Sequence, residues 1–184
     1  MCTDEMFYRR YLDGNEKAAV PLVEKYGDAL TLYINGYVKD MHEAEDLMIE
    51  AFSRMFMNTR PVSEEGSFKA YLYKTARNLA LRHRQKHRII FLHLDDLDFE
   101  PQSKDLADTR LYSDERRRVL TEALDQLKAE YREALYLVYF EDMSYRSAAA
   151  VMGKNEQQVT NLVHRGKQSL KTILEKEGFH YADD

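Results

Sequence analysis

Apolar side chains recur at every third or fourth position through most of the chain, which is the spacing of one face of an α-helix. In the first half this periodicity predicts helices near residues 4–12, 15–27, 30–38, 42–58 and 67–88. In the second half it predicts helices near residues 120–127, 131–139, 144–152 and 155–177. Seven Gly and three Pro are few for 184 residues, so the sequence predicts an all-α fold.

A segment without helical periodicity separates the two halves. It follows Arg88 and reads IIFLHLDDLDFEPQSKDLADTRLYSD, with Pro101 inside it and acids along its length. We therefore expect two small helical domains, over residues 1–90 and 114–184, joined by an acidic linker over residues 91–113.

The charge of the chain is distributed unevenly. The net charge of −5 is the sum of +1 over residues 1–88, −6 over 91–115 and zero over 116–184. Residues 66–88 hold seven Lys or Arg and no acid, so one helix is strongly basic in an acidic chain.

The composition excludes several classes of protein. Cys2 is the only cysteine, so neither an internal disulfide nor a Cys-based zinc site can form. The sequence has neither an apolar run near 18 residues nor a signal-peptide pattern at its start, so a cytoplasmic protein is expected. No Ser-His-Asp or Cys-His set and no Gly-rich phosphate loop is recognisable, so we expect neither an enzyme nor a bound cofactor.

Residues 144–170 predict a helix-turn-helix. They read SYRSAAAVMGKNEQQVTNLVHRGKQSL, with a turn at Gly153 and a second helix that Asn155 and Gln158 can cap reciprocally. The small Ala148 and Ala149 allow the two helices to approach closely. The second helix of this motif enters the major groove of DNA, although an ordinary antiparallel helix pair remains an alternative.

The outward side chains of that second helix are amides, which suit base edges, and cations, which suit phosphates. These candidate DNA-binding residues are Gln157, Gln158, Thr160, Asn161, His164, Arg165, Lys167 and Lys171.

The basic segment predicts a second nucleic-acid surface. A surface helix normally gains from Glu–Lys pairs four residues apart, and no acid is present here to form one. Cations beside Tyr71 and Tyr73 suit a nucleic acid backbone with unstacked bases, whereas a merely solvated face is the alternative.

A third surface is predicted on the helix HEAEDLMIEAFSRMF, residues 42–56. Asp46, Glu50 and Arg54 recur at four-residue spacing opposite its apolar face, either as a solvated face or as a protein-docking face. An HExxH zinc motif would need His where Asp46 stands, so no metal site is predicted.

The three motifs occur together, in order and over nearly the whole chain, and in this they resemble a bacterial extracytoplasmic-function (ECF) sigma factor. The resemblance rests on HEAEDLMIEAFSRMF, on GSFKAYLYKTARNLAL, and on residues 124–171, which begin LDQLKAEYREAL. It implies a factor that binds core RNA polymerase, directs it to promoter DNA at the −10 and −35 elements, and has no catalytic activity of its own. Many members of this family have an anti-sigma factor as a partner, so the resemblance also implies one here, although no feature of the sequence identifies it.

The resemblance also implies roles for residues of this chain. Docking on core polymerase would fall to Glu45, Asp46, Glu50 and Arg54. Capture and opening of the −10 element would fall to Asn58, Lys69, Tyr71, Lys74, Arg77, Asn78, Arg82 and Arg84. The helix-turn-helix would read the −35 element, and the acidic linker would thread the polymerase cleft.

A few positions depart from the usual family pattern. Ser147 stands where an acid commonly completes a capping box, and Tyr71 stands where Trp is usual. Thr160 and Leu162 replace common basic residues, so the second helix of the motif is less basic than in typical members.

Two other functions compete with this interpretation. A stand-alone helix-turn-helix regulator would explain residues 144–170 but neither the basic helix nor the acidic one. A metal-dependent nuclease would have to use Asp95, Asp96, Asp98 and Glu100, which lie in a segment with no predicted scaffold to hold a metal.

Overall fold

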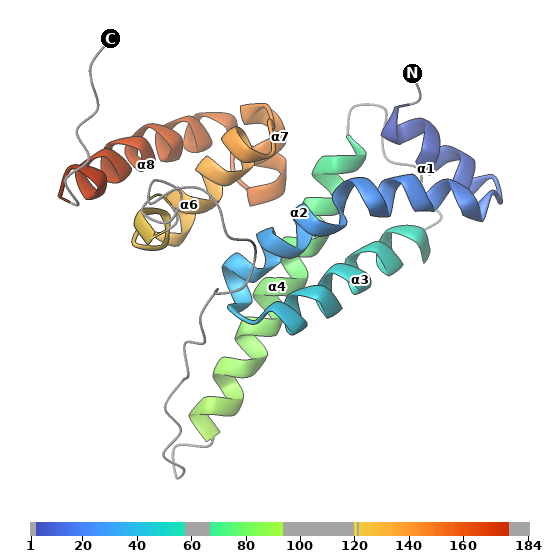
Figure 1. Ribbon diagram of the computed structural model, residues 1–184, viewed down its shortest axis with the longest axis horizontal. Helices are drawn as coiled ribbons and strands as arrows, with labels where there is room; N and C mark the ends of the chain where they lie inside the picture. Colours follow the sequence, from blue (N-terminus) through green and yellow to red (C-terminus); the bar gives the residue numbers. More distant parts are fainter. Residues whose placement is uncertain (1–2, 58–66, 94–119, 121, 177–184) are drawn as a thin grey trace, which may run out of the picture. The chain divides into compact units, whose positions relative to one another are not determined.

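The computed structural model describes residues 3–57, 67–93, 120 and 122–176. The chain divides into two compact units, Met1–Ser103 and Lys104–Asp184 (Figure 1). The described residues form helices and turns without a strand, so the prediction of an all-α protein with two helical units is confirmed. Among these described helices none combines the length and the apolarity needed to cross a membrane.

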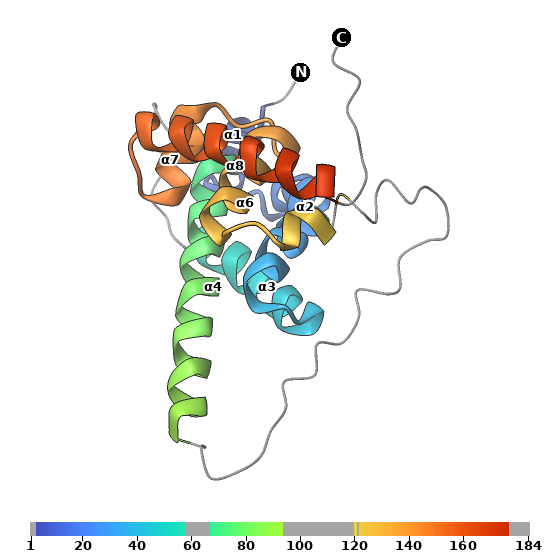
Figure 2. The same ribbon diagram turned by 90° about the vertical axis from the view of Figure 1, so that its left-hand side faces the viewer.

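The first unit contains four α-helices and one short 3-10 helix. They are α1 (Asp4–Leu12), η1 (Glu16–Ala19), α2 (Val20–Val38), α3 (Met41–Met57) and α4 (Phe68–His93). Figures 1 and 2 show α4 crossing α2 and α3 and continuing beyond the N-terminal end of α3. Ser67 caps α4 as predicted, because its Oγ accepts a hydrogen bond of 3.1 Å from Ala70 N.

The core of this unit is built from the apolar faces of α2, α3 and α4. Leu22 and Ile34 of α2 and Leu72 of α4 are completely buried. Aromatic rings extend the core toward α1, where the ring centroids of Tyr8 and Phe68 lie 5.3 Å apart. The buried Tyr8 hydroxyl donates to the Met55 carbonyl oxygen at 2.9 Å, so this polar group is satisfied inside the core.

The predicted break at Gly27 is wrong, because α2 runs through it without interruption. Gly27 lies on the buried face of α2 between Leu22 and Leu30, which both pack into the core. A glycine inside a helix costs about 1 kcal/mol, and burial of two leucines outweighs this several-fold. The basic helix is also longer than predicted, since α4 continues to His93 and includes the first residues assigned to the linker.

The second unit carries α6 (Ala129–Leu135), a π-helical turn η2 (Tyr136–Phe140), α7 (Tyr145–Met152) and α8 (Glu156–Lys176). In the π turn Glu141 N donates to Tyr136 O, a bond that spans five residues. Leu137, Val151 and Val159 are almost completely buried between these helices. The apolar faces that the periodicity predicted therefore meet in one small core.

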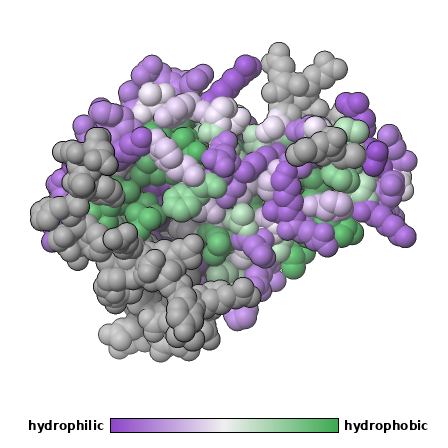
Figure 3. Space-filling model, turned by 45° about the horizontal axis from the view of Figure 1, so that its top comes forward, coloured by the Kyte–Doolittle hydropathy of each residue, from purple (hydrophilic) through white to green (hydrophobic). Residues whose placement is uncertain are grey.

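The described surface is mixed in character. In Figure 3 hydrophilic side chains are interspersed with smaller groups of hydrophobic ones. Several large apolar side chains are exposed, among them Ile49 at 58% and Leu32 at 54% of their maximal area. Single exposed apolar residues are normal, so each matters only where its helix has other features of a binding face.

Candidate nucleic-acid interface

The start of α8 has the reciprocal cap that the sequence predicted. Asn155 Oδ1 accepts a hydrogen bond of 2.8 Å from Gln158 N, and Gln158 Oε1 accepts one of 2.9 Å from Asn155 N. Gly153, at the end of α7, has φ of 65°, a left-handed conformation that glycine adopts without a Cβ clash. The turn and the first turn of α8 are therefore held in a defined geometry by local interactions.

The pair α7 and α8 packs through small residues. Ala148 and Ala149 are buried, as are Val159 and Val163 on α8. At Gly166 a Cβ atom would lie 3.2 Å from Leu135 Cδ1, so this glycine allows α8 to approach α6 closely. Ser144 caps α7, but Ser147 cannot complete the reciprocal bond, and its hydroxyl instead lies 2.9 Å from the Ser144 hydroxyl.

All eight candidate residues of α8 are exposed, as a DNA-contacting surface requires. Some already interact with neighbours on the same helix. Gln157 Nε2 lies 3.3 Å from Asn161 Oδ1, and Thr160 donates its hydroxyl to Glu156 O at 2.9 Å. These bonds fix the orientation of amide groups near the N-terminus of α8, where side chains of a recognition helix reach base edges.

The cations in the second half of α8 differ from one another. Lys167 lies over the ring of Tyr139, with its Nζ 4.6 Å from the ring centroid. A hydrogen bond with Tyr139 raises the pKa of Lys167, so the ammonium form is favoured. Lys171 Nζ lies 3.9 Å from Glu175 Oε1, an exposed pair that a phosphate could replace at little cost.

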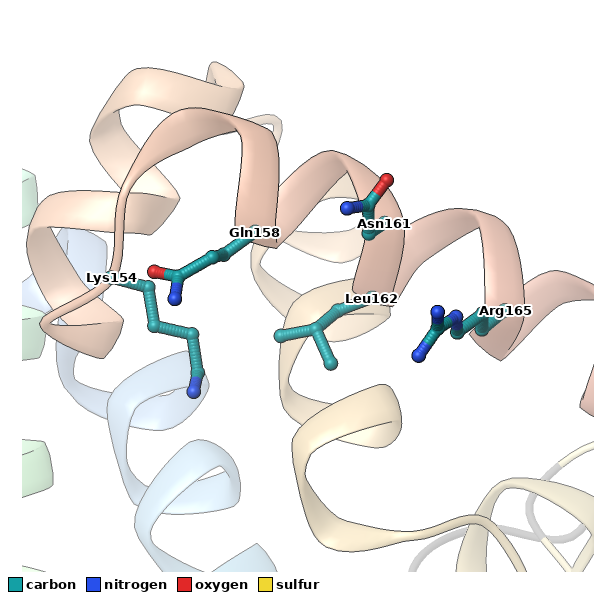
Figure 4. A pocket seen from close by; sticks show the side chains of 5 residues that line it. All are labelled: Lys154, Gln158, Asn161, Leu162 and Arg165. Atoms are coloured by element: carbon teal, nitrogen blue, oxygen red, sulfur yellow. The ribbon is translucent and has the colours of Figure 1, made fainter.

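A pocket on α8 adds two residues that sequence reasoning missed. Figure 4 shows Gln158, Leu162 and Arg165 following one another along the helix, with Lys154 in the preceding turn. Asn161 completes the lining. Leu162 is only half-buried, whereas Leu174 of the same helix lies in the core. The signal that could have identified Leu162 is its apolar side chain among amides and cations.

The basic helix α4 presents a row of exposed polar and aromatic residues. Tyr71, Lys74, Asn78 and Arg82 are all exposed and recur at three- and four-residue spacing, so they share one face. The opposite face is apolar, and Phe68, Leu72, Ala76 and Leu79 on it are buried. Arg84 is also exposed.

Three aromatic or basic residues of this segment are less accessible. Tyr73 is completely buried, so it belongs to the core and not to a base-stacking surface. Lys69 and Arg77 are half-buried, and the Lys69 ammonium lies 5.8 Å from the Tyr26 ring centroid and 5.7 Å from that of Tyr73. Only Tyr71 of the two tyrosines can therefore meet a base.

The acidic face of α3 is exposed at Glu45, Asp46 and Arg54. Glu50 is half-buried and accepts two hydrogen bonds from the Arg54 guanidinium, at 2.6 Å from Nη2 and 3.0 Å from Nε. Ile49 lies one residue before Glu50 and is mostly exposed, although the sequence analysis did not select it. The face therefore combines two exposed acids, one ion pair and one apolar side chain.

Some predicted residues lie outside the described residues. They are Asn58, a −10 candidate, and the four linker acids of the alternative nuclease hypothesis.

Comparison with known families assigns a model to each unit. The model described as Sigma-70 region 2 matches residues 22–89. The model described as Sigma-70, region 4, matches residues 117–170. The first range includes α3 and the basic face of α4, and the second includes the whole helix-turn-helix.

Relatives with assigned functions agree with this result. The ECF RNA polymerase sigma factor SigE of Mycolicibacterium smegmatis is 32% identical over 169 residues, covering 88% of this chain and 65% of that protein. SigM of Bacillus subtilis, another ECF sigma factor, is 26% identical over 155 residues, covering 84% of this chain and 94% of its own. Among solved structures, the sigma factor RpoE of Bartonella quintana, in complex with the anti-sigma factor NepR, has a TM-score of 0.73. It is 21% identical, and the match covers 86% of this chain and 98% of the other, so it supports the fold.

A helix-turn-helix in one unit and a strongly basic helix in the other are the architecture of a promoter-recognition factor. The chain belongs to the sigma-70 family, in its extracytoplasmic-function group. It is an alternative sigma factor, which binds core RNA polymerase and directs it to promoter DNA for transcription initiation.

Proposed function

We propose a division of labour in which residues 1–90 bind core polymerase and open the −10 element, while residues 114–184 read the −35 element. Residues 91–113 connect the two. The proposal is supported by the family models, of which region 2 ends at residue 89 and region 4 begins at residue 117.

The acidic face of α3 is the proposed docking surface for polymerase. Ile49 is the apolar anchor at its centre, and Glu45 and Asp46 are the flanking charges that select a basic partner surface. In protein interfaces a few apolar or aromatic anchors supply most of the binding free energy, and surrounding charges mainly set specificity. The ion pair between Glu50 and Arg54 keeps the rim of this face in one conformation.

The exposed row on α4 is the proposed −10 surface, and it is the observation that carries the proposal. Tyr71 is 39% exposed and can stack on an unpaired base, and Lys74 and Arg82, farther along the same face, can neutralise phosphates of the strand. Asn78 lies between the two cations and offers an amide to a base edge. A buried tyrosine at this place could not stack, so exposure of Tyr71 is the required condition.

The first turns of α8 are the proposed −35 reader. Gln157, Asn161 and Arg165 offer hydrogen bonds to base edges or phosphates. Leu162, in the pocket of Figure 4, is proposed to contact the methyl group of a thymine, for which an aliphatic side chain suits better than a cation.

The finer functional statements follow from this assignment. We infer that the chain performs no chemistry itself, since phosphodiester formation belongs to the polymerase, and that it acts in the cytoplasm beside the chromosome. Because RpoE of Bartonella quintana was solved with an anti-sigma factor, we further propose an inhibitor of that kind for this chain.

The decisive experiment combines polymerase binding with run-off transcription from templates with randomised upstream DNA. The wild-type protein should bind core polymerase and select a two-part promoter. Asp46→Arg should abolish binding to core while the helical content stays unchanged. Tyr71→Ala should leave core binding intact and weaken open-complex formation by about 1–3 kcal/mol, whereas Tyr71→Phe, which keeps the ring, should retain it.

Two results would overturn the assignment. Specific DNA binding without polymerase, together with no affinity for core, would favour the stand-alone regulator. Equal activity of Tyr71→Ala and Tyr71→Phe would remove Tyr71 from the −10 surface.

A further inference from the structure

Three side chains with metal-ligating groups meet between two helices of the first unit. Glu43 lies near the start of α3, and His83 and His87 lie in the second half of α4. One ligand atom of each lies within 4.8 Å of the others. His83 Nε2 is 2.6 Å from Glu43 Oε2, and His87 Nε2 is 3.8 Å from Glu43 Oε1.

The two histidines are arranged as a pair on one face of α4. They are four residues apart, and their ring centroids lie 4.1 Å from each other. Two histidines at this spacing on one helix are a common way to hold a zinc ion from one side. Glu43 approaches the pair from the other helix, so its carboxylate faces both rings.

The distances lie near those that a metal ion would impose. Ligands at about 2.0–2.1 Å from a tetrahedral zinc ion lie roughly 3.4 Å from one another. The carboxylate–imidazole distances are 2.6 Å from Oε2 to His83 and 3.8 Å from Oε1 to His87, so a small rotation of the carboxylate would bring one oxygen within ligand range of both rings.

A simple hydrogen-bond pair explains only part of the arrangement. The contact between Glu43 and His83 is a hydrogen bond, but 3.8 Å between Glu43 and His87 is too long for one. A cation that accepts a lone pair from each ring and from the carboxylate would use all three groups.

We propose that Glu43, His83 and His87 form a binding site for a divalent transition metal ion of the zinc type. Two imidazole nitrogens and one carboxylate suit Zn²⁺, whereas Mg²⁺ and Ca²⁺ prefer oxygen ligands throughout. Three protein ligands leave the fourth tetrahedral position to water or to a side chain of a partner. The side chains are 37%, 22% and 44% exposed in the order named, so an ion can enter from solvent.

The site would link the two functional helices of this unit. Glu43 is three residues before Asp46 of the proposed docking face, and His83 lies between Arg82 and Arg84 of the basic helix. Figures 1 and 2 show that α4 continues past the start of α3, where Glu43 lies. A metal there would clamp this part of α4 to α3 and add two positive charges beside the DNA-facing residues. No metal site was predicted from the sequence, so the proposal departs from that prediction.

The test uses the purified full chain after a chelator has removed any bound metal. Zn²⁺, with no other metal present, is titrated into this chain in competition with a chromophoric chelator. We expect one equivalent to bind. Glu43→Gln, His83→Gln and His87→Gln should each weaken binding at least about tenfold, since even outer-shell changes at metal sites cost 10–100-fold. His42→Gln, which removes an exposed histidine next to Glu43, should bind like wild type.

A second measurement does not depend on variants. Co²⁺ bound in place of Zn²⁺ should give the visible absorption bands of a tetrahedral site with nitrogen and oxygen ligands. Circular dichroism of each metal-free variant checks that its helices are formed. Less than a tenth of an equivalent of bound Zn²⁺, wild-type affinity in two or more of the three ligand variants, or the same loss in His42→Gln overturns the proposal.

Discussion

The cap of the recognition helix provides a sharp test of how this protein holds its −35 reader. The proposed change is Asn155→Ala, which removes the oxygen that accepts the 2.8 Å hydrogen bond from Gln158 N. The reciprocal bond from Asn155 N to Gln158 Oε1 uses a backbone donor and can persist. One capping bond is therefore lost and one is kept.

The magnitude follows from the exposure of the cap. Asn155 and Gln158 are both exposed, so water replaces the lost acceptor and the desolvation penalty of a buried group does not apply. Replacing an N-cap Asn by Ala then costs about 1 kcal/mol. For a unit the size of Lys104–Asp184 this lowers the midpoint of thermal unfolding by about 4–8 °C.

The assay is differential scanning calorimetry of the full chain, followed by −35-dependent transcription at 25 °C. Only the transition of the second unit should shift, and promoter preference should not change, because Asn155 positions α8 and is not among the proposed base readers. Asn155→Ser is the matched control, since its hydroxyl keeps an acceptor at the same place without adding charge.

Two outcomes would refute this reasoning. An unchanged transition in Asn155→Ala would show that water serves Gln158 N as well as the side chain does. An equal loss in Asn155→Ser would show that the amide, and not the acceptor oxygen, is what the helix needs.

Two further predictions concern the packing and the titration of the second unit. Gly166→Val should destabilise this unit by about 1–3 kcal/mol, because a Cβ at this position would lie 3.2 Å from Leu135 Cδ1 and 3.3 Å from Tyr131 Cβ. Gly166→Ala should destabilise it less, since Ala gains about 1 kcal/mol of helix propensity over Gly. Equal denaturation midpoints for Gly166→Val and wild type would contradict the close approach of the helices. Burial, followed by the neighbouring Glu141 carboxylate, raises the pKa of Tyr136, so the unfolded chain loses this proton first and stability should fall as pH rises above about 10. Urea unfolding between pH 9 and 12 should therefore give a shallower decline for Tyr136→Phe, by up to about 1.4 kcal/mol per pH unit, and identical slopes would contradict it.

Local features of this chain could be predicted from the sequence because they depend on few neighbouring residues. The bonds between Asn155 and Gln158, the left-handed Gly153 and the cap at Ser67 each span at most three or four residues. Order and spacing of three such motifs also indicated the family.

Features that depend on packing between helices were predicted less well. The helix α2 continues through Gly27 because one continuous helix buries Leu22 and Leu30 in the same core. Tyr73 was misjudged for a similar reason, since periodicity defines a face of a helix but not which residues at its edge other helices cover.

The sequence by itself determined the helices, their caps, the basic segment and the family, because hydrogen bonds within a turn and apolar periodicity are encoded by neighbours along the chain. The tertiary structure decided which of the two tyrosines of the basic segment, Tyr71 and Tyr73, faces solvent and which groups meet across helices. Glu43 and His83 are forty residues apart in sequence, and their side chains come within 2.6 Å only because α3 and α4 pack on the same core. Contacts of that range depend on the crossing of helices, which no local pattern specifies.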